Sequence, residues 1–129
     1  MALVEFAIVL PVLLLIVIGA IEFARAINIK QVVVNSAREG ARIVALPPGV
    51  NSNEALVRSR VDDYLTSNAL DLSKRTVTIV GIDGAPGTVG EVTVTYQYTF
   101  DFFGGIASFF GGSDPGTITL GSTSKMRNE

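Results

Sequence analysis

The sequence contains no cysteine and no histidine. These absences exclude disulfides, thiol nucleophiles, imidazole bases and most transition-metal sites. It also has no phosphate-binding loop, no dinucleotide fingerprint and no recognisable catalytic triad. The formal net charge is −2 and the basic residues are dispersed, so nothing indicates nucleic-acid binding. We therefore expect a structural protein without enzymatic activity, and with no catalytic site, metal or cofactor.

Charge is also absent from a long stretch near the N-terminus. Residues 6–21 carry no charged side chain, and a helix over residues 1–21 would be roughly 30 Å long. Because this length matches the hydrocarbon core of a bilayer, the segment is predicted to span a membrane. The helical pattern then continues as an amphipathic stretch until Pro47 and Pro48 stop it. We expect one helix over residues 1–45.

The chain divides into three parts by composition. Residues 1–22 form a membrane or filament-core helix, residues 23–46 its amphipathic continuation, and residues 47–129 a globular α/β head. A head of about 80 residues is small for an independent core, so it is expected to pack on the outer half of the long helix. The predicted fold class is α+β, with a long N-terminal hydrophobic helix, a short second helix and an antiparallel sheet of about three strands.

Glu5 is the one acidic residue in the segment predicted to span the membrane. An ionised carboxylate there costs roughly 2.5–3.5 kcal/mol at the bilayer centre and less near its end. Two interpretations are open. In one, Glu5 lies at the interface and gains only from the nearby helix N-terminus. In the other, it recruits the Met1 amino group of another copy, so that polymerisation neutralises both charges.

A family resemblance supports the second interpretation. The stretch ALVEFAIVLPVLLLIVIGAIEFARA, followed by NSAREGAR, resembles the start of TadE-like pilins, members of the type IV pilin superfamily from tight-adherence systems. The ending SKMRNE is more weakly similar to the same family. In that superfamily a prepilin peptidase cuts after a Gly, and a Glu stands fifth in the mature chain, as Glu5 does here. The resemblance implies a pilin-like fold, and we expect Met1 to begin the mature protein after removal of a short basic leader.

The resemblance also implies a function. It implies a structural subunit of a bacterial surface filament, which polymerises through its N-terminal helix and serves adhesion or surface attachment. The precursor would lie in the bacterial inner membrane, and the assembled subunit in an extracellular filament. The implied partners are copies of the chain itself, a prepilin peptidase and an assembly ATPase. Two alternatives stay open: a minor pseudopilin that initiates or caps a filament of another subunit, and a membrane-anchored binding module that does not polymerise.

Several features of the long helix suggest how it packs. Pro11 and Gly19 weaken it, which a lone anchor tolerates and which would let the helix bend inside a filament. Glu22 and Arg25 lie at helical-neighbour spacing and predict a wet or interhelical face. A strip of small residues at about four-residue spacing would receive either the protein's own sheet or another helix. Its members are Ser36, Ala37, Gly40, Ala41 and Ala45.

A second helix is predicted after the prolines. Asn51 with Glu54 reads as a capping box that begins a helix of about four turns. On this helix Arg58 and Asp62 are expected to form a solvated ion pair.

The rest of the head alternates with the period of two that is typical of strands. Strands are predicted over residues 76–82, 91–102 and 117–127. The second strand is expected to bury Val92, Val94, Tyr96, Tyr98, Phe100 and Phe102. The last strand is expected to place Ile118, Leu120 and Met126 on one face.

Residues 102–116 are predicted to form an apolar loop bracketed by glycine pairs. The loop is either an exposed patch that awaits a partner or a segment folded back on the head. We interpret its apolar residues as a candidate subunit contact. They are Phe102, Phe103, Ile106, Phe109 and Phe110.

Overall fold

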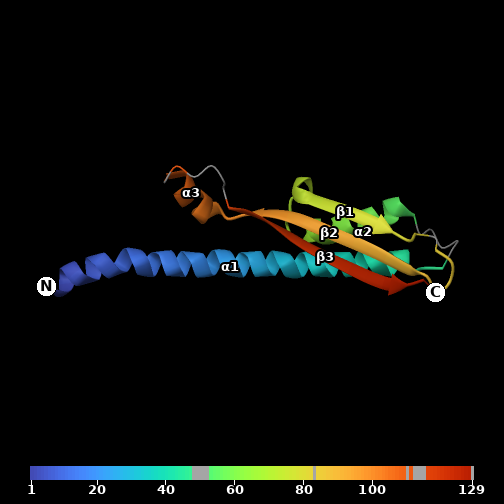
Figure 1. The fold of residues 1–129 in the computed structure, drawn as a ribbon, viewed down its shortest axis with the longest axis horizontal. Helices are drawn as coiled ribbons and strands as arrows, with labels where there is room; N and C mark the ends of the chain where they lie inside the picture. Colours follow the sequence, from blue (N-terminus) through green and yellow to red (C-terminus); the bar gives the residue numbers. More distant parts are fainter. Residues whose placement is uncertain (48–52, 83, 110, 112–115, 129) are drawn as a thin grey trace. The chain divides into compact units, whose positions relative to one another are not determined.

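The computed structural model describes residues 1–47, 53–82, 84–109, 111 and 116–128. It confirms an α+β fold with a long N-terminal helix, a short second helix and a three-stranded antiparallel sheet (Figure 1). The elements in chain order are α1 (Ala2–Val44), α2 (Glu54–Ser67), the 3₁₀ turn η1 (Leu72–Lys74), β1 (Arg75–Val80), β2 (Val89–Thr99), α3 (Asp101–Phe109) and β3 (Thr117–Arg127).

The chain forms two compact units, and α1 contributes to both. Unit 1 consists of Met1–Asn28 and Thr99–Ile118, so it contains the apolar part of α1 together with α3. Unit 2 consists of Ile29–Tyr98 and Thr119–Glu129, so it contains the rest of α1, α2 and most of the sheet. The two parts of α1 therefore have different neighbours.

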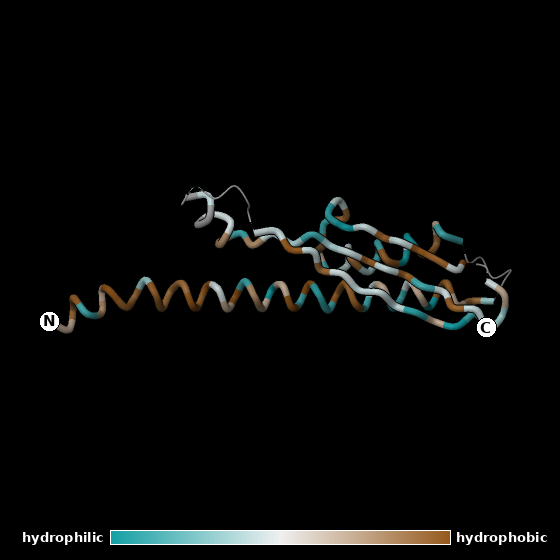
Figure 2. The backbone as a smooth tube through the Cα atoms, viewed as in Figure 1, coloured by the Kyte–Doolittle hydropathy of each residue, from teal (hydrophilic) through white to brown (hydrophobic). Residues whose placement is uncertain are grey.

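The predicted long helix is confirmed. α1 passes through both Pro11 and Gly19 without interruption and ends at Val44, three residues before Pro47. A residue that precedes proline is disfavoured in the helical region, which explains the end. Apolar residues run almost without a break along the first part of α1, whereas polar and apolar residues alternate along the second (Figure 2).

The second helix has the predicted length, but its cap was assigned two residues too early. Asn51 lies outside the described residues, and the N-cap is Asn53, whose side-chain oxygen accepts a hydrogen bond of 2.7 Å from the backbone N–H of Leu56. Asn53 fits because a cap side chain reaches the N–H group three residues ahead.

The predicted pair between Arg58 and Asp62 is wrong. Arg58 instead pairs with Glu54, one turn earlier on α2, at 2.6 Å. Asp62 pairs with Arg75 at the start of β1, at 2.5 Å. The strand therefore supplies a cation that the helical spacing alone did not reveal.

The sheet has the order β1-β2-β3, so β2 is the central strand. β1 and β2 are antiparallel, with Thr76 opposite Thr95 and Thr78 opposite Thr93. On the other side of β2, the hydroxyls of Thr93 and Thr123 are 2.9 Å apart. β1 ends at Val80 rather than at residue 82, because Gly81 follows with φ of +82° and turns the chain out of the strand.

The core of unit 2 lies between one face of the sheet and two helices. α1 and α2 supply Val33, Ala37, Ala41, Val44, Val57, Val61 and Leu65, and the sheet supplies Val77, Val92, Val94 and Tyr96. Gly40 permits this packing, since a Cβ atom there would be only 2.9 Å from Cγ2 of Val61 and 3.1 Å from Cγ1 of Val92. The sheet thus packs on the C-terminal part of α1, as predicted.

One expectation for the central strand is wrong in detail. β2 ends at Thr99, and the helix α3 begins at Asp101, where a continued strand and then a loop were predicted. β3 has the predicted bounds, and along it Ile118 and Met126 are exposed and Leu120 is half-buried. Phe100 and Phe102 consequently lie outside the buried row of β2.

Tyr96 supplies a test of the unit 2 core. Its side chain is 5% exposed and its hydroxyl accepts a 3.3 Å hydrogen bond from the backbone N–H of Asp71. We expect Tyr96→Ala to lower the free energy of unfolding by about 3–5 kcal/mol, because it removes a buried ring and leaves a cavity. Gln97→Ala, at the exposed neighbouring position, is the matched control and should change it by less than about 0.5 kcal/mol.

The measurement is urea unfolding of the detergent-solubilised full chain, followed by circular dichroism. Equal midpoints for the Tyr96 and Gln97 variants would contradict the assignment of Tyr96 to the core.

Candidate functional site

The most unusual surface of the protein is the apolar part of α1. Its most apolar 18-residue window is long and apolar enough to cross a membrane, and the chain buries none of that window. Large side chains such as Leu3, Ile8, Leu14 and Val17 are exposed. No part of the chain that the structure describes buries them, so this segment requires an apolar environment from outside.

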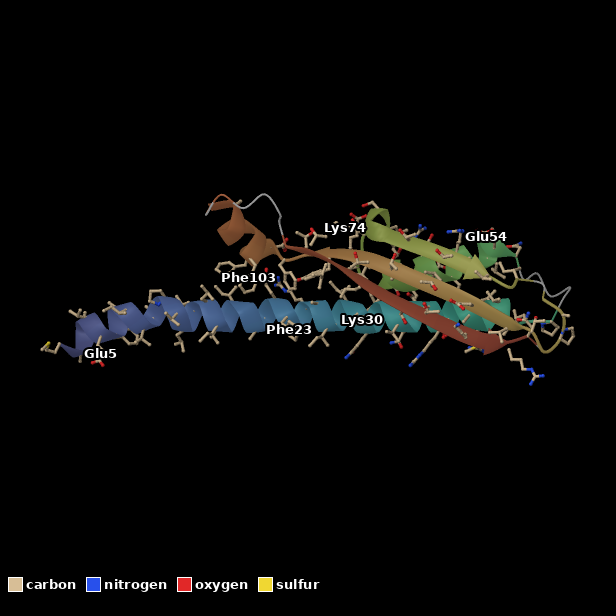
Figure 3. The ribbon with its side chains drawn as sticks, in the orientation of Figure 1. Glu5, Phe23, Lys30, Glu54, Lys74 and Phe103 are labelled. Carbon is tan, nitrogen blue, oxygen red and sulfur yellow. The ribbon has the colours of Figure 1, made fainter. Side chains whose placement is uncertain are left out.

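Glu5 is the only charged side chain among the first 21 residues. It is exposed, as is Met1, and Figure 3 shows it projecting away from α1. Among the ion pairs of the described residues, none joins Glu5 to the amino group of Met1 or to any other cation. The carboxylate is therefore free to pair with a group outside the chain.

Gly19 lies where α3 approaches α1 within unit 1. A Cβ atom at Gly19 would lie 3.2 Å from Cζ of Phe103, which is tighter than ordinary van der Waals contact. Phe103 points from α3 toward α1 (Figure 3). Gly19 therefore provides the space into which this ring fits, whereas Pro11 remains a residue of the exposed apolar surface.

Glu22 was expected on a wet or interhelical face beside Arg25, and the structure shows an interhelical contact with α3. The Glu22 side chain is 4% exposed. Its Oε1 accepts a 2.6 Å hydrogen bond from the backbone N–H of Phe102, in the first turn of α3. Its Oε2 is buried and has no hydrogen-bond partner among the described residues.

The position of Glu22 is explained by the unsatisfied groups at a helix start. The first N–H groups of α3 have no partner inside the helix, and the helix dipole places partial positive charge there. A carboxylate from α1 satisfies one of these donors and is stabilised in turn. Glu22 is thus a positioning residue that holds the start of α3 beside the end of the apolar part of α1.

The aromatic residues at the start of α3 are only partly covered. Phe102 is 37% exposed and Phe103 is 38% exposed. The ring of Phe103 meets those of Phe100 and Phe102 edge to face, at centroid distances of 6.2 and 6.1 Å. The other members of the candidate subunit contact, the side chains of Ile106 and Phe109 and the whole of Phe110, lie outside the described residues.

The strip of small residues on α1 lies in unit 2. Ser36, Ala37 and Ala41 are fully buried, Gly40 is buried and Ala45 is partly buried. The side chains that approach Gly40 come from α2 and β2. The protein's own helix and sheet therefore cover the strip.

Sequence reasoning did not find the Glu22–α3 contact. A signal was present, because the large residues at 102, 103, 106, 109 and 110 recur at helical spacing. Gly104 and Gly105 obscured it, since glycine disfavours a helix interior. Within the described residues, no group of three acidic side chains is arranged to hold a metal ion.

Glu22 can be tested directly. We expect Glu22→Ala to speed the hydrogen exchange of the Phe102 amide by about 5- to 100-fold, because a buried donor left without an acceptor costs about 1–3 kcal/mol. Glu22→Gln is the matched control, since it keeps the acceptor oxygen and should retain most of the protection. Exchange of the peptide that contains Phe102, followed by mass spectrometry on the full chain in detergent, is the measurement. Unchanged exchange in Glu22→Ala would show that Glu22 does not hold α3.

Comparison with known protein families gives a match to the long helix. The model of the TadE-like protein family matches residues 1–42, a range that includes Glu5, Gly19 and Glu22 and almost all of α1. Searches of curated proteins and of solved structures found no match. The family suggests a protein associated with the Tad pilus, and the apolar helix indicates membrane anchoring. Over residues 1–42 the chain is thus similar to the TadE-like protein family, which supports a pilin-related protein.

Proposed function

We propose that the protein is a structural subunit of a bacterial surface filament, which polymerises through α1 and serves adhesion or surface attachment. One observation carries the proposal. The described residues bury none of the most apolar window of α1, and the apolar part holds one carboxylate, Glu5, which forms no ion pair with any of these residues. In this proposal lipid covers the segment before assembly and neighbouring α1 helices cover it in the filament.

Apolar packing alone does not favour the transfer of α1 from the membrane into a filament. Lipid chains are as apolar as leucine, so moving α1 from lipid to a bundle of helices yields no hydrophobic gain. A polar interaction that lipid cannot supply has to favour the filament. Glu5 is the one side chain in the segment that can make it.

The proposed partner of Glu5 is the Met1 amino group of a neighbouring subunit. Both groups are exposed, and each is costly to bury alone in an apolar medium. Pairing them removes both costs in one contact, and it occurs only when a second subunit is present. Breaking one side of such a buried pair costs roughly 3–5 kcal/mol.

Unit 2 has a supporting role in this proposal. Its own elements cover the small-residue strip of α1, so polymerisation is assigned to the N-terminal part of α1. We propose that unit 2 is a packing domain without enzymatic activity. The subunit would be processed by a prepilin peptidase in the inner membrane and moved into the extracellular filament by an assembly ATPase.

The test is to replace Glu5 in cells that lack the native protein. We expect Glu5→Ala and Glu5→Gln to abolish or strongly reduce sheared filaments while membrane insertion stays intact, because losing the charge makes the segment more apolar. Glu5→Asp should be intermediate, since the charge survives and its reach shortens. Filaments and membrane-bound subunit are compared by immunoblot and electron microscopy.

The matched control is Glu54→Ala, which removes an exposed carboxylate whose ion pair with Arg58 contributes about 0–1 kcal/mol. It should leave filament yield unchanged. A normal yield from Glu5→Ala would show that Glu5 is a tolerated interfacial carboxylate. Filaments in which this chain is rare or confined to an end would favour a minor pseudopilin, and a complete absence of filaments would favour a membrane-anchored binding module.

A further inference from the structure

We infer that α3 is a second membrane contact, which lies in the lipid interface beside the end of the α1 span. The inference rests on membrane anchoring by α1 and is independent of filament formation. The proposed occupant of the exposed side of α3 is the boundary between lipid headgroups and acyl chains. The observations that support it are the height of α3 along α1, its composition and its partly covered aromatic residues.

The position of α3 along the axis of α1 follows from two contacts within unit 1. Glu22 holds the backbone of Phe102, and Phe103 fits against Gly19. The charge-free run of α1 ends at Ile21. At about 1.5 Å per residue, both contacts lie within roughly 5 Å of that end along the helix axis. The start of α3 is therefore at the level where a membrane-spanning α1 leaves the hydrocarbon core.

The composition of α3 suits this level. Residues 102–109 contain no charged side chain, and large apolar residues recur at 102, 103, 106 and 109. This spacing is typical of one apolar helix face. Asp101 and the buried Glu22 carboxylate stand together at the start of the helix. A helix that lies in the interface plane buries its apolar face about 5–10 Å into the headgroup and acyl boundary, and Phe is one of the residues found on such a face.

Partial exposure of Phe102 and Phe103 points to lipid as the occupant. Phe102 keeps 37% and Phe103 38% of its residue surface exposed after both have packed within unit 1. Phe103 lies against Gly19, and Val17 and Ile21, two residues to either side of Gly19 on α1, are exposed. An apolar environment that covers this part of α1 therefore extends to the rings of α3. A second copy would cover them only after assembly, whereas lipid is present from insertion onward.

The test uses single tryptophans, because the sequence contains none. Phe102→Trp and Phe103→Trp are made separately in the full chain, so that poor folding of one does not decide the result. Each is reconstituted at high dilution into phosphatidylcholine–phosphatidylglycerol vesicles whose acyl chains carry bromine either near the headgroup or near the chain end. Bromine quenches tryptophan only at short range, so the two lipids report depth.

We expect either tryptophan in α3 to lose about half of its emission with the shallow bromine and less with the deep bromine, as an interfacial depth requires. Leu14→Trp, in the exposed apolar part of α1, is the positive control and should be quenched by the deep bromine. Val80→Trp, exposed on β1 in unit 2, is the matched control and should be quenched by neither.

Quenching of both α3 tryptophans no stronger than that of Val80→Trp would overturn the inference. A blue shift of their emission that appears only when the protein is concentrated in the vesicles would also overturn it, and would assign α3 to a second copy. Failure of Leu14→Trp to be quenched would remove the membrane anchoring on which the inference rests, whereas failed filament assembly with normal α3 quenching would affect only the proposed function.

Discussion

The structure depends on one constraint, which is that a helix segment with no charge over residues 6–21 has to be kept from water. The described residues bury none of its most apolar window. A carboxylate near this segment needs a partner, because burying an isolated charge in an apolar environment is energetically costly. Glu5 and Glu22 stand at the two ends of the segment, and the chain treats them differently. Glu22 receives a hydrogen bond from α3, and Glu5 receives none in the described structure.

The second part of α1, from Ile29 to Val44, packs closely against α2 and the sheet through small residues. Ser36, Ala37, Gly40 and Ala41 are all buried under α2 and the sheet. A helix with bulky residues at these positions could not approach β2 and α2 this closely, as the short distances around Gly40 indicate. Side-chain size along one continuous helix therefore decides which part is covered by the chain and which part is left for the surroundings.

The sequence predicted the elements whose signals are local. The absence of charge and of stop signals defined α1, and a period of two defined β3. The predictions failed where a distant residue decided the outcome. Arg58 and Asp62 have suitable spacing for an ion pair, yet Asp62 pairs instead with Arg75 on β1.

The largest miss was α3. The alternation of β2 runs on through Phe100 and Phe102 in the sequence, and Gly104 with Gly105 argues against a helix. Contact with α1 stabilises the helix that the local sequence disfavours. Glu22 accepts a hydrogen bond from the first turn of α3, and Gly19 leaves space for Phe103. For the candidate site, Glu5 could be found from its isolation in an apolar run. Glu22 could not, because its role appears only when α3 exists.

The contrast between the two carboxylates separates anchoring from assembly. Glu22 already accepts a hydrogen bond from its own chain, so pairing it with a neighbouring subunit would release little free energy. Its contribution is to fix the start of α3 at the end of the apolar segment. Glu5 has no such donor, so in the proposed filament its pairing energy is released only by a second subunit. Lipid and protein neighbours are nearly equivalent for the apolar side chains between them. In the proposed function, apolar residues hold α1 in the membrane and the charge of Glu5 favours its transfer to the filament.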